Sequence, residues 1–183
     1  MTLLGSPPKG LVLTPGASAD RDHSTLVAIE EALPEVEVLR LTLGTTSVNR
    51  AVDKVIDATQ EFASRIGADM GEIVAGGRSF GGRACSVAAA EGLGVGGLLL
   101  LSYPLHPPGK PEKLRVDHFP KIAVPTWFIS GEKDPFGTPA EFEQHVSVIE
   151  GPVNFSWVGG GHSPKNAQER VVVEHVRAAI VGS

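Results

Sequence analysis

The sequence predicts an α/β fold with a mostly parallel sheet of about six strands and helices on both faces. Two observations point to it. Short apolar runs alternate along the chain with longer stretches in which apolar residues recur at helical spacing. The short runs carry few polar side chains, as strands do when both faces of a parallel sheet are buried. With 42% hydrophobic and 20% charged residues, a chain of 183 residues can build a real core, and we expect one domain over residues 1–183.

The first half of the chain supplies three of the expected strands, each a short apolar run that ends in turn residues. These strands cover 11–14, 36–41 and 73–75, and the helices that follow them cover 23–33, 48–66 and 80–91. Asp22 is a suitable N-cap for the first helix, and Pro34 marks its end. Regular apolar spacing identifies the second helix. The third helix is rich in small residues, including Cys85, which we assign to close packing against the sheet.

The second half continues the alternation, with strands at 97–102, 126–130 and 153–158 and helices at 139–148 and 166–180. The glycines of segment 92–97 spell G-x-G-x-x-G, but they follow a helix and precede a strand, which is the wrong context for a dinucleotide site. We interpret them as a helix C-cap and turn. Only the proline-rich segment 103–125 separates two strands there. It is too short for a cap domain, so we expect a shallow, open site.

Charge and composition exclude several classes of partner. The net charge is −5, and Lys and Arg are scattered, which argues against nucleic acid and against an anionic membrane surface. No apolar run approaches the roughly 20 residues that span a bilayer, and the start of the chain lacks the features of a signal peptide. A single cysteine suits a reducing compartment, so we expect a cytoplasmic protein. The oligomeric state is left open, and a monomer fits the sequence.

One stretch carries the strongest chemical signal. Gly77-Arg78-Ser79-Phe80-Gly81 fits G-x-S-x-G, the nucleophile elbow, between a predicted strand and a predicted helix. The glycines are needed because side chains there would collide with adjoining backbone, and the serine is exposed at a helix N-terminus. The alternative is a glycine-rich turn with an idle serine. We favour Ser79 as a nucleophile.

Ser79, Asp134 and His162 follow three separate predicted strands, in the order nucleophile, acid, histidine. A serine needs an imidazole to take its proton, and the imidazole needs a carboxylate to orient it. The N–H groups of Phe80 and Ala17 are the expected oxyanion donors. The alternatives are that Asp134 only caps an Asp-Pro turn and that His162 is a surface-loop histidine.

Other polar and aromatic residues fall near the same edge of the sheet. His106, Tyr103 and Phe136 are candidates for the substrate pocket, although His106 serves equally well to order its loop. Arg83 follows Ser79 by one helical turn. An ion pair that braces the helix is favoured over a substrate contact for Arg83, and a similar structural role is favoured for Arg78. The remaining histidines lack metal-ligand spacing, so we assign no metal; they are His23, His118, His145 and His175.

With these residues identified, the chain resembles the short, dienelactone-hydrolase-like branch of the α/β-hydrolases. More narrowly, it resembles the group related to a histone-acetyltransferase-complex subunit. The motifs that carry the resemblance are Gly76–Arg83, Tyr103–Glu112 and Gly131–Gly137. The resemblance implies a minimal α/β-hydrolase fold and a Ser-His-Asp core. The sequence departs from the family at Pro15-Gly16, where His-Gly is usual, and we expect the first two strands of larger hydrolases to be absent or reduced.

We therefore expect a serine hydrolase that cleaves a small carboxylester, lactone or thioester through an acyl-Ser79 intermediate. Its partner is a small ester-like molecule, and no metal or organic cofactor is implied. The alternative is a non-catalytic α/β-hydrolase-like module for protein interaction. A flavodoxin-like nucleotide-binding protein is a third reading, but it rests on the parallel sheet alone because the sequence lacks a phosphate loop.

Overall fold

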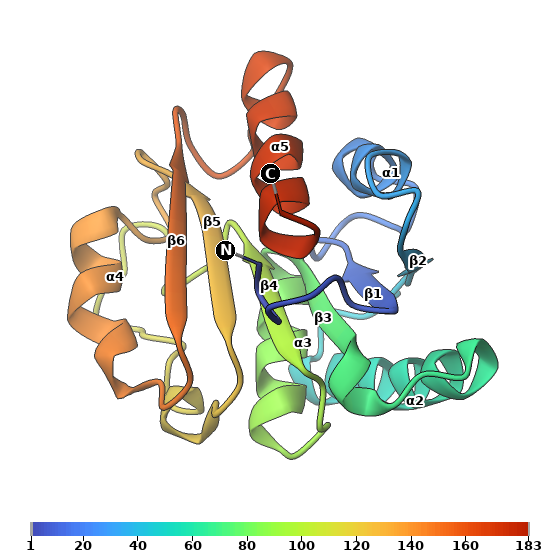
Figure 1. Cartoon of the computed structure of the whole chain (residues 1–183). Helices are drawn as coiled ribbons and strands as arrows, with labels where there is room; N and C mark the ends of the chain where they lie inside the picture. Colours follow the sequence, from blue (N-terminus) through green and yellow to red (C-terminus); the bar gives the residue numbers. More distant parts are fainter. Residues whose placement is uncertain (1, 183) are drawn as a thin grey trace.

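A six-stranded parallel sheet organises the molecule (Figure 1). The computed structural model describes residues 2–182. The strands are β1 (Gly10–Thr14), β2 (Glu37–Arg40), β3 (Ile73–Arg78), β4 (Gly97–Leu101), β5 (Thr126–Gly131) and β6 (Val153–Val158). They lie in the order β2-β1-β3-β4-β5-β6, and each neighbouring pair is parallel. The predicted sheet is confirmed.

Helices cover both faces of this sheet (Figure 1). They are α1 (Ser24–Glu31), α2 (Val48–Ile66), α3 (Phe80–Ala90), α4 (Pro139–His145) and α5 (Ala167–Ile180). One face carries α1 and α5, and the other carries α2, α3 and α4. The strand order explains this division. The chain first moves from β1 to β2 and then reverses toward β3, and right-handed crossovers in opposite directions place α1 and α2 on opposite faces.

Side chains of β1 alternate between the two faces of the sheet and so contribute to two separate parts of the core. Leu11 and Leu13 are buried against the layer that contains α1 and α5, whereas Val12 is buried against the layer that contains α2 and α3. All three are fully buried, as expected for a strand in the middle of a doubly covered sheet. Because β2 and β3 flank β1, the strand order reverses there. The loops after β1 and β3 diverge at that point, which is where open α/β sheets form their sites.

Several predicted boundaries are wrong, among them the end of the first helix, which lies at Glu31 instead of Leu33. His23 caps α1 in place of Asp22: its Nδ1 accepts a hydrogen bond from Thr25 N (3.3 Å), while the Asp22 carboxylate lies 2.9 Å from Arg40 Nη1. The helix predicted over 139–148 ends at His145, and a 3-10 turn over Val146–Val148 follows. β3 extends three residues beyond its predicted end, to Arg78. The turn expected over 92–97 is confirmed, with positive φ at two of its glycines.

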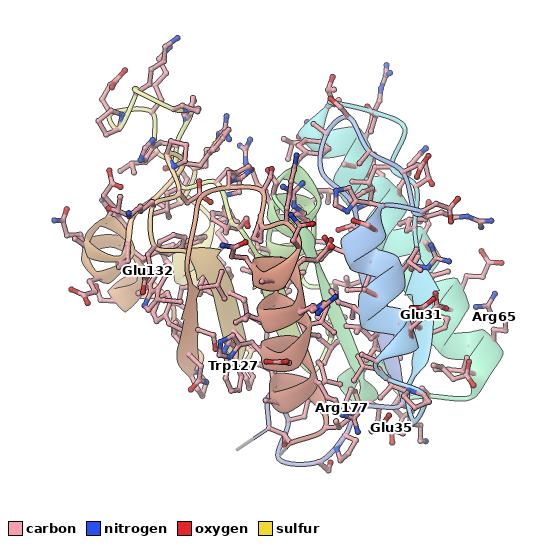
Figure 2. The ribbon with its side chains drawn as sticks, turned by 90° about the horizontal axis from the view of Figure 1, so that it is seen from above. Glu31, Glu35, Arg65, Trp127, Glu132 and Arg177 are labelled. Atoms are coloured by element: carbon pink, nitrogen blue, oxygen red, sulfur yellow. The ribbon has the colours of Figure 1, made fainter. Side chains whose placement is uncertain are left out.

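The last helix closes the fold against the start of the chain. Arg177 of α5 forms an ion pair with Glu35, just beyond α1, with Nη2 and Oε1 2.7 Å apart (Figure 2). Leu3 N donates to Ala179 O (2.7 Å), so both ends of the described chain lie side by side. Within residues 2–182, no helix has the length and apolar composition required for a membrane span.

Candidate active site

Ser79 lies at the sharp turn between β3 and α3. Its φ of 51° and ψ of −116° are rare for a residue with a side chain, and such strain persists only where the surroundings hold it. Two backbone hydrogen bonds do so here. Ser79 N donates to Leu101 O at the end of β4 (2.8 Å), and Ser79 O accepts from Arg83 N in the first turn of α3 (3.0 Å). The turn therefore projects the hydroxyl beyond the carboxyl end of the sheet.

Glycines allow α3 and β3 to pack tightly against the end of β1. A Cβ on Gly77 would overlap the backbone and side chain of Thr14, and a Cβ on Gly81 would overlap Pro15 O and Thr14 Oγ1. Thr14 itself is fully buried and donates a hydrogen bond from Oγ1 to Gly76 O (3.0 Å). The glycine spacing of the elbow is thus explained by close backbone contact with a neighbouring strand.

His162 lies within hydrogen-bonding distance of both Ser79 and Asp134. His162 Nε2 is 2.8 Å from Ser79 Oγ, and His162 Nδ1 is 2.8 Å from Asp134 Oδ2. The Asp134 side chain is 1% exposed and that of His162 is 16% exposed. With a proton on Nδ1, the imidazole presents its Nε2 lone pair to the hydroxyl. The arrangement can therefore move a proton from Ser79 to His162 while the carboxylate stabilises the charged ring.

Contacts within and between the loops after β5 and β6 fix the positions of Asp134 and His162. Lys133 N donates to Gly160 O (2.9 Å), and Phe136 N donates to the second Asp134 oxygen, Oδ1 (2.9 Å). The Phe136 ring stacks on the imidazole of His162, with ring centroids 4.0 Å apart. The acid and the histidine are therefore held by backbone bonds as well as by their own contact.

Arg78 braces the histidine loop from β3. Its Nη2 donates to the carbonyl oxygen of His162 (2.9 Å) and to Ser163 Oγ. Burial lowers the pKa of Arg78, but a guanidinium titrates so high that the group stays charged. Arg78 therefore has the structural role favoured for it, through hydrogen bonds to the His162 carbonyl and the Ser163 hydroxyl.

A cavity of about 320 Å³ opens beside Ser79. It is lined by Ala17, Thr46, Val48, Ser79, Phe80, Arg83, Pro104, Arg115 and Phe136. Among the residues described, no acceptor takes the N–H of Ala17 or of Phe80. Phe80 is the first residue of α3, so its N–H also lies at the positive end of the helix dipole. Both residues whose amides are the predicted oxyanion donors therefore line the same cavity as Ser79, and neither amide has an acceptor among residues 2–182.

Two predicted pocket residues are elsewhere. Tyr103 is fully buried among aromatic rings, and its hydroxyl donates to Arg115 O (2.7 Å). His106 is 5% exposed, with Nδ1 2.8 Å from Pro107 O and Nε2 3.1 Å from Glu141 Oε1. Both rings order the segment after β4 and do not line the cavity. The expectation of a pocket role is wrong for Tyr103, and the loop-ordering alternative fits His106.

Arg83 also differs from its favoured interpretation. It lines the cavity and forms no ion pair with any carboxylate of residues 2–182. Arg115, which lines the same cavity, was missed by the sequence reasoning, as were Thr46, Val48 and Pro104. Their place in the sequence could have indicated Pro104 and Arg115, because both belong to the segment that leaves the carboxyl end of β4, where sites form in parallel sheets.

A second hollow, of about 360 Å³, is lined by residues that include Arg78, His23 and Glu169 but not Ser79. Within residues 2–182, no three His, Cys, Asp or Glu side chains are arranged to hold a metal ion.

Comparison with known proteins agrees with this architecture. Residues 7–179 match the family model described as an alpha/beta hydrolase domain. The structure is similar to Est1E from Butyrivibrio proteoclasticus (TM-score 0.75, 18% identity, covering 94% of this chain and 86% of that one). It is also similar to dienelactone hydrolase from Anabaena variabilis (TM-score 0.75, 17% identity, 95% and 85%). A third similar structure is acetyl xylan esterase from Paenibacillus sp. R4 (TM-score 0.71, 14% identity, 98% and 76%).

At these identities the structural likeness shows a shared fold. The family match adds the sequence itself, because it extends over nearly the whole chain, from before β1 to the last turn of α5. The six parallel strands, the helices on both faces and the turn that carries Ser79 are the expected minimal form of that fold. The chain belongs to the alpha/beta hydrolase family.

Proposed function

We propose that the protein is a serine hydrolase that cleaves a small carboxylester, lactone or thioester. The observation that supports this most strongly is the line from Ser79 Oγ to His162 Nε2 and from His162 Nδ1 to Asp134 Oδ2, with 2.8 Å at each step. A hydroxyl, an imidazole and a buried carboxylate in this order are what acyl transfer through serine requires.

In the proposed reaction, Ser79 Oγ attacks the substrate carbonyl as its proton passes to His162 Nε2. The C–O or C–S bond to the leaving group then breaks, the leaving group takes that proton, and the acyl group remains on Ser79. Water then attacks the acyl-serine as His162 Nε2 takes its proton. The acyl C–O bond to Ser79 breaks, His162 returns the proton to Ser79 Oγ, and the acid is released. The N–H groups of Ala17 and Phe80, which no acceptor of the described chain uses, would stabilise the oxyanion in both steps.

The resemblance to dienelactone hydrolase and the small volume of the cavity favour a small substrate over a lipid. We further propose that the protein acts in the cytoplasm on a small molecule, since its one cysteine is buried and free.

Labelling with a fluorophosphonate probe tests the nucleophile. The wild type should be labelled, and it should hydrolyse p-nitrophenyl acetate and butyrate. Ser79→Ala should lose both activities while its circular dichroism spectrum and urea unfolding midpoint stay unchanged. Ser130→Ala is the matched control, because Ser130 is a buried serine of β5 outside the cavity. Equal labelling of Ser79→Ala and the wild type would remove Ser79 from this role.

One observation favours a second candidate, a non-catalytic interaction module. Pro15 stands where the family usually has a histidine, and the group with the histone-acetyltransferase-complex subunit gives this alternative its precedent. A folded wild type that neither turns over the esters nor reacts with the probe would favour this module.

A further inference from the structure

Two arginines share the Ser79 cavity without an acidic partner. Arg83 comes from the first turn of α3, and Arg115 comes from the segment between β4 and β5. Other cationic side chains of the protein, such as Arg40 and Arg177, form ion pairs at 2.6–2.9 Å. Among residues 2–182, no carboxylate pairs with Arg83 or with Arg115. The cavity therefore concentrates two positive charges that the described chain does not neutralise.

Both arginines are held by fixed backbone. Arg115 N donates to Leu105 O (2.7 Å), and Arg115 O accepts from the buried Tyr103 hydroxyl (2.7 Å). Arg83 N donates to Ser79 O (3.0 Å), which ties its position to the elbow itself. Arg83 Nε is buried and has no hydrogen-bond partner in the part of the chain that the structure describes. A buried donor without an acceptor is costly, so this atom is a hydrogen-bond donor that a bound acceptor can satisfy.

The surroundings respond to this unbalanced charge. Burial lowers the pKa of Arg115, and the nearby positive charge of Arg83 lowers it further. Burial, and then the same Arg83 charge, lower the pKa of His118 to about 4. The N-terminus of α3 adds its positive dipole at the same place. In a protein of net charge −5, this is a local positive site in a cavity, the arrangement that attracts an anion.

We propose that the substrate of this site carries a carboxylate, which binds Arg83 and Arg115 while its ester carbonyl lies at Ser79. This assignment rests on the proposed hydrolase function and names its substrate class. Guanidinium groups match the planar oxygens of a carboxylate and bind them in pairs. Arg83 follows Ser79 by one helical turn, and both residues line the same cavity of about 320 Å³, so a short molecule can place its carbonyl at Ser79 and its carboxylate at the arginines.

The apolar part of the cavity fits such a linker. Val48, Pro104 and Phe136 supply apolar lining in the same cavity. The cavity volume of about 320 Å³ is near the lower end of the range for ligand-binding cavities. A short half-ester of a dicarboxylic acid therefore has the right chemistry: a reactive carbonyl, a short aliphatic chain and a terminal carboxylate.

The test compares two esters of the same chain length, mono-p-nitrophenyl glutarate and p-nitrophenyl valerate. The wild type should show a kcat/KM at least about tenfold higher for the glutarate ester, as expected for a charge-assisted contact. Arg83→Gln and Arg115→Gln should each lower the ratio of the two kcat/KM values about tenfold. Arg65→Gln is the control for lost charge, because Arg65 lies about 25 Å from the cavity residue Val48 along α2. It should leave both kcat/KM values unchanged.

A binding measurement makes the test independent of turnover. Titration of glutarate into Ser79→Ala by calorimetry should show binding that Arg83→Gln, added to that variant, weakens about tenfold. Titration of inorganic phosphate in parallel separates carboxylate recognition from general anion binding, and equal affinity for phosphate would overturn the assignment to carboxylate. Equal kcat/KM for both esters, with Ser79-dependent turnover, would overturn this inference and leave the hydrolase proposal standing. If glutarate binds as expected but neither ester is turned over, the carboxylate site stands and the hydrolase proposal is overturned.

Discussion

At the scale of single residues, Asp134 uses each of its carboxylate oxygens for a different contact. Oδ1 accepts from the N–H of Phe136, and Oδ2 faces Nδ1 of His162. Because the first contact requires an acceptor, only the second oxygen is free to orient the imidazole. The backbone of the turn thus determines which carboxylate oxygen faces His162, and an acceptor at that place favours the tautomer with its proton on Nδ1.

This division predicts the effect of Asp134→Asn. The amide oxygen should stay with Phe136 N–H, so the NH₂ group would face His162 Nδ1. Two donors cannot share that contact, and the ring would move its proton to Nε2, where it can no longer accept from Ser79. We expect kcat for p-nitrophenyl butyrate to fall about 10⁴-fold, with the fold retained, because the wrong tautomer has a cost of that order in serine hydrolases.

Steady-state kinetics with circular dichroism measures this effect, and Asp117→Asn is the control, since Asp117 is exposed and lies outside the cavity. A rate for Asp134→Asn within tenfold of the wild type would contradict the assigned contact.

At the scale of elements, the contact between the β3–α3 turn and the end of β1 sets the position of the nucleophile. Gly81→Ala should lower the free energy of unfolding by about 2–3 kcal/mol, because the new methyl group would overlap Pro15 O and Thr14 Oγ1 in a fully buried place. Gly71→Ala should change it by less than about 0.5 kcal/mol, since no atom lies within 4 Å of the added Cβ. Urea unfolding of both variants measures the difference, and equal midpoints would refute the close-contact explanation.

Periodicity and turn residues were sufficient to predict all six strands and five helices, because each apolar run is bounded by Gly, Pro or polar residues. The end of β3 was underestimated for a physical reason. Gly76, Gly77 and Arg78 have weak strand propensity, yet they pair with Leu99, Leu100 and Leu101 of β4, and this tertiary pairing overrides propensity. The N-cap of α1 was missed because Asp22 is engaged by Arg40, a residue of another element.

The sequence could predict those residues of the candidate site that directly follow the end of a strand. Ser79, Asp134 and His162 each follow a strand of a parallel sheet, so topology alone brings them to one edge. Side-chain direction in the segment after β4 was not predictable in this way. Tyr103 and Arg115 lie in the same irregular segment, and only the packing of aromatic rings decides that the tyrosine turns inward while the arginine lines the cavity.

At the scale of the whole molecule, stability should depend on pH through a half-buried histidine, His118. His118 Nε2 lies 2.8 Å from Ser86 Oγ, whose own hydroxyl donates to Arg83 O (2.9 Å). The ring therefore donates to Ser86 in its neutral form. Burial, and then the charge of Arg83, lower its pKa to about 4, from about 6.5 in the unfolded chain.

The sign of the effect follows from which state binds the proton. Between about pH 6.5 and pH 4 the unfolded chain protonates His118 and the native protein does not, so the free energy of unfolding falls as the pH is lowered through this range. Each pH unit corresponds to about 1.4 kcal/mol at most, and partial exposure of the ring reduces this. We expect the wild type to lose about 1–2 kcal/mol between about pH 7 and pH 4.5 through this one group.

His118→Gln isolates that contribution. The glutamine amide can donate to Ser86 Oγ as the imidazole does, but it does not titrate. Urea unfolding of both proteins at the two pH values gives a double difference in which the other histidines and carboxylates cancel. The variant should lose about 1–2 kcal/mol less than the wild type on acidification. Parallel losses in the two proteins would mean that His118 takes its proton in the native state at an ordinary pH, and that the positive charge of Arg83 does not reach it.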